Sequence, residues 1–190
     1  MSKKKAIILI LAALFVIVAC GLIWFILYGG KGDSDNAEPP ENMPKTADVS
    51  GKSIADFIAS EPSLTNFNKL IKAAGEDGIL KTTANSYLVI APINKAFNTL
   101  PNGYFESLLT ADKMSIAQNI AKYHIAVLAN NQITAGQKLK TQEGQEIIVG
   151  KEGDKLTFTS AKGDTALALK EPFKTANGQV YVVDHVMLPQ

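Results

Sequence analysis

The hydrophobic pattern divides the chain into three stretches. An uninterrupted apolar run covers residues 6–28, and residues 29–50 are polar and rich in glycine, proline and acidic side chains. From residue 51 onward, apolar positions recur first at helical and then at strand spacing. This order predicts an N-terminal signal-anchor or transmembrane segment (1–28), a flexible linker (29–50) and one folded domain (51–190).

The first stretch has the length and the flanking residues of a membrane span. As an α-helix its 23 residues would extend over roughly 34 Å, enough to cross a hydrocarbon core of about 30 Å. Lysines occupy positions 3–5 before it, and Trp24 and Tyr28 lie near its far end. We therefore expect a single-pass anchor with a cytoplasmic N-terminus and a domain outside the cytoplasm, at the cell surface or in a periplasm.

The same stretch allows a second interpretation. Residues 17–20, reading I-V-A-C, fit a bacterial lipobox, in which the chain is cut before the cysteine and that cysteine is lipidated. However, residues 21–28 remain apolar, whereas a lipid-anchored chain normally becomes polar directly after its cysteine. The pattern favours a retained membrane helix, and Cys20 stays a candidate lipidation site.

Helical spacing characterises the first part of the folded region. Ser53 and Asp56 have the spacing of a capping box and predict a helix start. Gly75 is the expected stop of a second helix, a third is expected over residues 101–109, and Asp112 is the expected N-cap of a fourth. The positions expected to face the core are Ile54, Phe57, Ile58, Leu64, Phe67, Leu70, Ile71, Ala74, Phe105, Leu108, Leu109, Ile116, Ile120 and Tyr123.

Alternating apolar and polar residues characterise the part after residue 132. Three apolar pairs at two-residue spacing predict half-buried antiparallel strands, and Asn177-Gly178 has the composition of a two-residue hairpin turn. Residues 180–188 are apolar on both faces, which predicts a strand through the centre of a sheet. The three pairs are Ile147 and Val149, Leu156 and Phe158, and Leu167 and Leu169.

One apolar strand precedes the alternating part and is also expected to be buried on both faces. It covers residues 87–91 and must stop at Pro92, because proline lacks the N–H that would continue the ladder. Asn94 is then the expected N-cap of a helical turn whose Phe97 faces inward. Helices first, strands afterwards and one early buried strand predict an α+β domain.

Three motifs in order give this region a family resemblance. Residues 91–97, reading A-P-I-N-K-A-F, resemble the first signature of the fasciclin domain, with Ile93 where the family usually has threonine. Tyr123-His124 after a helix and the closing stretch 178–189 resemble two further family features. The chain is therefore similar to a single-domain, membrane-anchored fasciclin-like protein.

The resemblance implies a fold and a binding region. The implied fold is a compact β-sandwich wedge with helices packed along one side. Because the Tyr-His region of fasciclin domains in animal matrix proteins has been tied to adhesion, the resemblance implies Tyr123, His124 and Ile125 as partner-binding residues. The signature residues with an implied structural role are Ala91, Pro92, Asn94 and Phe97.

Asp184 is the polar residue that we expect to be buried. It lies inside the apolar stretch 180–188, so its carboxylate needs donors from the backbone or from a helix N-terminus. We therefore predict a structural role, in which Asp184 anchors the last strand to the corner formed by residues 87–97.

Charge and composition exclude some classes of protein. The net charge is +1 and all 19 basic residues are lysines, which argues against nucleic-acid partners, since these usually require arginine. The single cysteine is Cys20, so the folded region has no disulfide. Neither of the two histidines, His124 and His185, has metal-ligand spacing around it, and G-x-S-x-G does not occur. The sequence predicts a protein without enzymatic activity, metal or cofactor.

These observations predict a surface module that binds something outside the cell. The expected partner is an extracellular protein or a glycan, and many copies on one membrane would gain strength through avidity. Two alternatives remain open: a carrier of a small hydrophobic ligand, and a structural module that organises the envelope by self-association. The pattern does not decide the oligomeric state.

Overall fold

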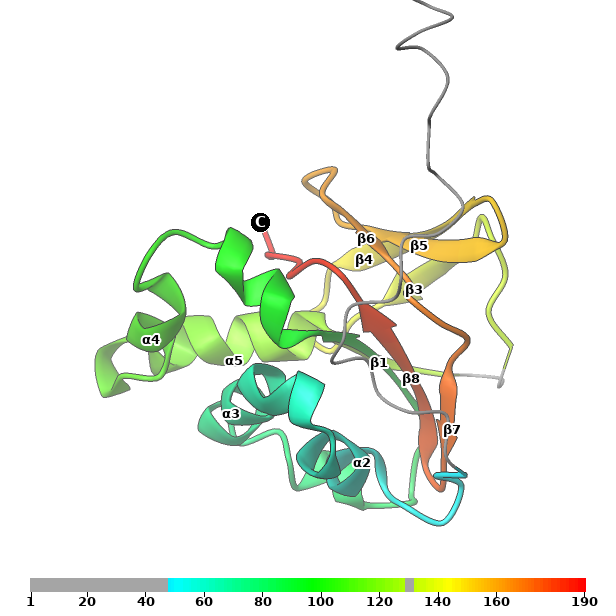
Figure 1. Ribbon diagram of the computed structural model, residues 1–190, viewed down its shortest axis with the longest axis horizontal. Helices are drawn as coiled ribbons and strands as arrows, with labels where there is room; N and C mark the ends of the chain where they lie inside the picture. The colour runs from blue at the N-terminus through cyan, green and yellow to red at the C-terminus, as the bar shows by residue number, and fades with distance from the viewer. Residues whose placement is uncertain (1–47, 129–131) are drawn as a thin grey trace, which may run out of the picture. The chain divides into compact units, whose positions relative to one another are not determined.

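The computed structural model describes residues 48–128 and 132–190. The predicted membrane span, nearly all of the predicted linker and Cys20 lie outside these residues. Within the two described ranges, none of the helices has the length and apolarity that a membrane span requires. The described part consists of two four-stranded sheets and a group of helices (Figure 1).

The first sheet has the strand order β2-β1-β8-β7 and contains both strands that were expected to be buried on two faces. Its two central strands, β1 and β8, are parallel, and each pairs with an antiparallel edge strand. The prediction that the early strand stops at Pro92 is confirmed. The bounds are β1 (Tyr87–Pro92), β2 (Ile125–Val127), β7 (Phe173–Thr175) and β8 (Gly178–Val183).

The second sheet is an antiparallel meander in the order β3-β4-β5-β6. β4 alternates between core-facing and exposed residues, as the sequence predicts for a half-buried strand, whereas in β5 the adjacent Thr157 and Phe158 are both buried. The bounds are β3 (Lys138–Lys140), β4 (Glu146–Glu152), β5 (Lys155–Thr159) and β6 (Thr165–Leu167).

The helices cover the face of the first sheet that points away from the second sheet (Figure 1). The capping interaction predicted at the first helix is confirmed, because the Asp56 N–H donates to Ser53 Oγ at 3.1 Å. The α-helices are α2 (Ile54–Ser60), α3 (Thr65–Ala73), α4 (Tyr104–Leu108) and α5 (Met114–Tyr123), and the 3₁₀ turns are η1 (Pro62–Leu64), η2 (Ile79–Lys81), η3 (Asn94–Thr99) and η4 (Ala111–Lys113).

The first sheet is therefore the middle layer between two hydrophobic cores. In β1, Val89 and Ala91 belong to the core shared with the helices, whereas Leu88 and Ile90 belong to the core between the sheets. The residues of β8 alternate in the same way. Since successive side chains of a strand point to opposite faces, only a strand in a middle layer is apolar at every position.

Two positions in the strand region differ from the prediction: the core residue of β6 and the turn between β7 and β8. In β6 it is Ala166, not Leu167, that is buried in the core, because Ala166 pairs with the buried Phe158. The hairpin turn between β7 and β8 consists of Ala176 and Asn177, and Gly178 already pairs with Thr175.

The start of α5 also differs from the prediction. The residue before the helix is Lys113, and no side chain caps it, so Asp112 is not the N-cap. Ile116 is 43% exposed, and the smaller Ala117 takes the core position instead.

Asn94 caps a helix other than the one expected. It makes no cap to its own turn, η3. Its Oδ1 accepts from the Asn66 N–H at 2.9 Å, and its Nδ2 donates to the Pro62 carbonyl at 2.8 Å. Asn66 is in the first turn of α3, so Asn94 fixes the corner after β1 to the start of that helix.

Candidate functional site

The three residues that the resemblance implied for partner binding are in the interior. The exposed fractions of Tyr123, His124 and Ile125 are 0%, 1% and 0%. A partner at the surface of this fold cannot contact these side chains. The expectation that they form the binding surface is therefore wrong. The end of α5 and the start of β2 place Tyr123 in the core between the sheets and Ile125 in the core shared with the helices.

His124 is a buried, hydrogen-bonded structural residue. Its Nδ1 donates to the Ile120 carbonyl at 2.8 Å, and its Nε2 accepts from the Met187 N–H at 3.2 Å. One donating and one accepting nitrogen describe a neutral imidazole. Burial lowers the pKa of His124 from 6.5 to about 4. His124 thus joins the end of α5 to the C-terminal segment without carrying a charge.

Tyr123 connects α5 to the second sheet. Its hydroxyl accepts from the Ala161 N–H, in the turn between β5 and β6, at 3.1 Å. Burial raises the pKa of Tyr123, so the phenol stays protonated. Tyr123 and His124 therefore join the end of α5 to the second sheet and to the C-terminal segment.

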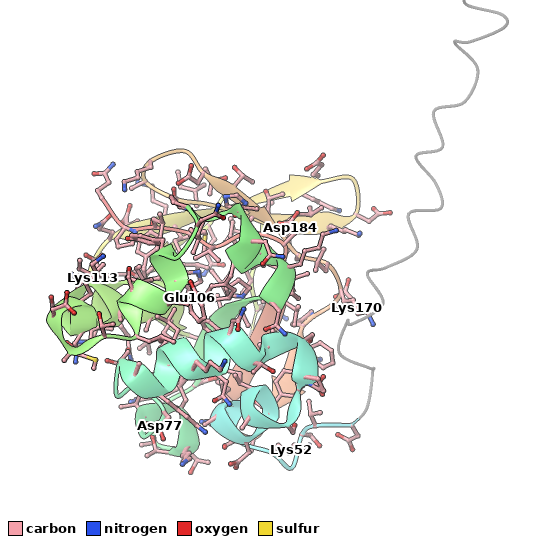
Figure 2. The ribbon with its side chains drawn as sticks, turned by 60° about the vertical axis from the view of Figure 1, so that its left-hand side comes forward. Lys52, Asp77, Glu106, Lys113, Lys170 and Asp184 are labelled. Carbon is pink, nitrogen blue, oxygen red and sulfur yellow. The ribbon has the colours of Figure 1, made fainter. Side chains whose placement is uncertain are left out.

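Asp184 is exposed, contrary to the expectation of a buried carboxylate (Figure 2). The chain leaves the sheet after Val183, so Asp184 lies beyond the strand end. Its Oδ1 accepts from the Leu167 N–H at 2.8 Å, and its own N–H donates to the Leu167 carbonyl at 3.3 Å. Asp184 thus fixes the end of β8 to β6, and not to the corner after β1.

No metal-binding cluster is present in the part of the chain that the structure describes. Over residues 48–128 and 132–190, no three His, Cys, Asp or Glu side chains are placed to hold a metal ion. His185 is partly exposed, whereas His124 is buried and has both ring nitrogens engaged. The two histidines therefore do not form a site together.

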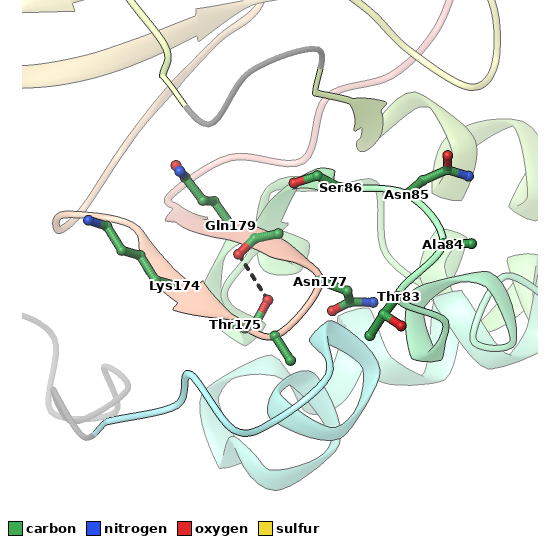
Figure 3. Close-up of a pocket in the computed structure, with 10 residues that line it drawn as sticks. Thr83, Ala84, Asn85, Ser86, Lys174, Thr175, Asn177 and Gln179 are labelled. Atoms are coloured by element: carbon green, nitrogen blue, oxygen red, sulfur yellow. Dashed lines mark hydrogen bonds between the residues drawn. The ribbon is translucent and has the colours of Figure 1, made fainter.

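A polar hollow at one end of the first sheet is the candidate site, and we call it the basin (Figure 3). Its volume is about 410 Å³, within the usual range for small-ligand pockets. Two segments far apart in the sequence form it: the loop before β1 and the β7–β8 hairpin. The lining residues are Thr83, Ala84, Asn85, Ser86, Lys174, Thr175, Ala176, Asn177, Gly178 and Gln179.

Asn177 holds the two walls of the basin together. Its Nδ2 donates to the carbonyls of Leu80 and Thr82 at 2.7 and 2.8 Å, and its Oδ1 accepts from the Ile54 N–H at 2.8 Å. The side chain is 3% exposed, so these bonds are shielded from water. Asn177 thereby caps α2 and ties the loop before β1 to the hairpin.

Gly178 permits the close approach of the hairpin to β1. Its φ is +149°, and a Cβ atom at this position would lie 1.9 Å from the Tyr87 carbonyl oxygen. The Tyr87 N–H donates to the Asn177 carbonyl at 2.9 Å. Only glycine leaves room for this contact.

Lys174 is the one ionisable residue among those that line the basin. It is exposed, and it forms no ion pair with another described residue. Lys174 and Gln179 are directly paired across the hairpin and extend to the same side of it (Figure 3). The basin therefore offers a positive charge beside hydroxyl and amide groups.

Sequence reasoning missed the basin. The signal was present in two polar segments, residues 82–86 and 174–179, which directly precede the apolar stretches 87–92 and 180–183. What the sequence does not reveal is the parallel pairing of β1 with β8, which brings the two segments together.

A second hollow, of about 490 Å³, lies on the second sheet and has both Lys140 and Glu146 in its lining. These two residues are paired directly across β3 and β4. The lining of this hollow therefore includes a carboxylate, which forms an ion pair with Lys138 at 3.0 Å, whereas the basin has no acidic residue in its lining.

Comparison with known proteins now assigns a family. The fasciclin domain matches residues 62–189. The chain belongs to the fasciclin domain family. Domains of this family are in general adhesion-type binding modules without enzymatic activity.

Relatives of this fasciclin-domain protein come from animals and bacteria. Human periostin is 31% identical over 147 residues, which is 73% of this chain but 16% of periostin. Protein sll1483 from a Synechocystis strain is 27% identical over 83% of this chain and 84% of its own length. Immunogenic protein MPB70 from Mycobacterium bovis is 27% identical over 84% of this chain and 81% of its own length.

The fold also matches a solved fasciclin structure. The FAS1 domain pair from the insect cell adhesion molecule Fasciclin I superposes with a TM-score of 0.64 at 17% sequence identity. The match covers 73% of this chain and 51% of the insect chain. At this identity the likeness shows the fold alone, an α+β arrangement of two sheets and helices.

Proposed function

We propose that this fasciclin-domain protein is an adhesion module, tethered to a membrane and binding an extracellular protein or glycan. The single observation that carries the proposal is the family assignment over residues 62–189, because fasciclin domains are in general binding modules. The apolar stretch 6–28 and the polar stretch 29–50 supply the anchor and the spacer in this proposal. The module has no catalytic role.

The basin is the surface feature that we assign to binding. Its walls are fixed by buried hydrogen bonds of Asn177, so little order has to be created when a partner binds. Its lining is mainly polar, which argues against an apolar cargo at this site and so against the carrier alternative.

Liposome adhesion tests the proposal. The full chain is reconstituted into fluorescent liposomes, and these are incubated with source cells and with arrays of extracellular glycans and proteins. The matched control carries residues 1–50 alone, so that anchor and spacer are the same. We expect retention above the control that increases with the number of chains per liposome, as avidity requires. Equal retention of both preparations on every surface would refute the adhesion function.

A further inference from the structure

We infer that the basin binds an acidic saccharide, with Lys174 holding a carboxylate of the sugar and the neighbouring hydroxyl and amide groups holding its hydroxyls. This inference deepens the proposed function, because it names the chemistry of the partner. Three properties of the basin support it: the kind of groups in the lining, their charge and their rigidity.

The lining matches a ligand that is hydroxylated over its whole surface. Ala84 and Ala176 are the only lining residues with purely apolar side chains. A peptide with large apolar side chains would require apolar pockets, and the lining offers few apolar side chains to form them. A saccharide has hydroxyls on every side, and Thr83, Asn85 and Thr175 offer polar groups at several points of the wall.

The charge selects an anion. Lys174 is the cation, and the lining contains no carboxylate that would neutralise it or repel an acidic ligand. A charge-assisted hydrogen bond from an ammonium to a carboxylate is roughly twice as strong as one between neutral groups. The basin should therefore distinguish a uronic acid from the corresponding neutral sugar.

The walls are preorganised. Besides the bonds of Asn177, Thr175 Oγ1 donates to the Gly178 carbonyl at 3.0 Å, and Asn85 Nδ2 donates to the Tyr87 hydroxyl at 3.2 Å. The Ala176 N–H donates to the Lys52 carbonyl at 2.8 Å, which holds the tip of the hairpin. Figure 3 shows the loop and the hairpin facing each other across the hollow. The cost of ordering these walls on binding is therefore small, and the exposed Lys174 side chain is the main group that remains to be ordered.

The probes are digalacturonate and its uncharged counterpart galactobiose. The full chain, in lipid nanodiscs and labelled with ¹³C at the alanine methyl groups, is titrated with each sugar and followed by NMR. Ala84 and Ala176 report from the basin, and Ala59, on α2, reports from a surface away from it. We expect the signals of Ala84 and Ala176 to shift with digalacturonate while that of Ala59 stays in place, and galactobiose to bind at least about five-fold more weakly.

Two variants assign the contacts. Lys174→Gln removes the charge but keeps a polar side chain, and it should weaken binding of digalacturonate about five-fold while leaving binding of galactobiose unchanged. The matched control is Lys162→Gln, in the exposed turn between β5 and β6, which should change neither affinity. Both lysines are exposed, so folding should be preserved, and the dispersion of the spectra checks this directly.

Three results would overturn the inference: no shift of Ala84 and Ala176 with either sugar, equal affinity for both sugars, or the same loss of affinity in the two lysine variants. Tighter binding of the dipeptide acetyl-Asp-Asp-amide than of digalacturonate would also overturn it, in favour of an acidic peptide. If the liposomes fail to adhere but digalacturonate shifts the two methyl signals, the adhesion function is wrong and the saccharide site stands.

Discussion

Lowering the pH from 7 to 4 is expected to destabilise the domain through His124. In the folded state this imidazole is buried, with both nitrogens hydrogen-bonded, and its pKa is about 4, against 6.5 for an ordinary histidine. Between these two values the unfolded chain binds a proton at this position and the folded chain does not. The free energy of unfolding therefore falls as the pH drops from about 6.5 to about 4, and the contribution of His124 is constant below that range.

The size of the effect follows from the difference of about 2.5 pKa units between the two states. At 1.36 kcal/mol per unit, the loss amounts to about 3 kcal/mol. Domains of this size are typically stable by only about 5–15 kcal/mol, so the loss is readily measurable.

Urea unfolding at a series of pH values measures this loss. The fragment 40–190 is suitable because it corresponds to one compact unit of the chain. The glutamine in His124→Gln cannot take up a proton. Between pH 7 and pH 4, the free energy of unfolding of this variant should therefore fall by about 3 kcal/mol less than that of the parent. The variant His185→Gln, at the partly exposed second histidine, is the matched control. Carboxylates that titrate in this range are common to all three proteins and cancel in the comparison.

A second measurement keeps the reasoning testable if His124→Gln does not fold. An NMR titration of the parent fragment gives the pKa of each histidine directly. If the imidazole of His124 titrates near 6.5 in the folded state, the argument from its burial and hydrogen bonds is refuted.

Three substitutions test the frame of the basin and the end of the last strand, each by urea unfolding of the same fragment. Asn177→Ala leaves two buried backbone groups and one partly buried one without this partner, and should lower the free energy of unfolding by about 3 kcal/mol; a loss below about 1 kcal/mol would contradict its role in holding the walls. Gly178→Ala should lower the free energy of unfolding by about 2–4 kcal/mol, because the new methyl group would clash with the Tyr87 carbonyl oxygen. Its matched control is Gly163→Ala, at an open position with φ of +93°, which should lower it by only about 1 kcal/mol. An equal loss of unfolding free energy in the two glycine variants would show that the close contact of Gly178 with Tyr87 is unimportant. Asp184→Ala should lower the free energy of unfolding by about 1 kcal/mol, because it removes the hydrogen bond to the Leu167 N–H in β6. An unchanged urea midpoint would show that this bond does not stabilise the fold.

The elements with strong hydrophobic periodicity could be predicted from the sequence. The buried strand ending at Pro92 and the helix begun by Ser53 were predicted correctly, because each depends on local chemistry. Asn94 and Asp184 were placed wrongly, since their partners, at Asn66 and Leu167, come from other parts of the chain. Local rules assign a capping side chain to its nearest helix, and tertiary structure overrides them here.

The candidate site was harder to predict than the fold. Tyr123 and His124 were expected to bind a partner only because the Tyr-His region of the family they resemble has been tied to adhesion, and the sequence itself did not show whether these side chains are exposed. Their polar atoms instead bond to the Ala161 and Met187 N–H groups, contacts that exist only once the two sheets and the C-terminal segment have assembled. The basin depends on the same long-range pairing, so no window of the sequence could have outlined it.

The parallel pairing of β1 with β8 sets the order in which the domain can form during synthesis. β8 is the last of the described strands to leave the ribosome, yet it contributes to both cores through its alternate residues. Until residues 178–183 have emerged, β1 lacks its neighbour at the centre of the sheet, and neither core can close. Because such distant contacts are slow to form, the nascent domain stays open until its strand β8 is available for pairing.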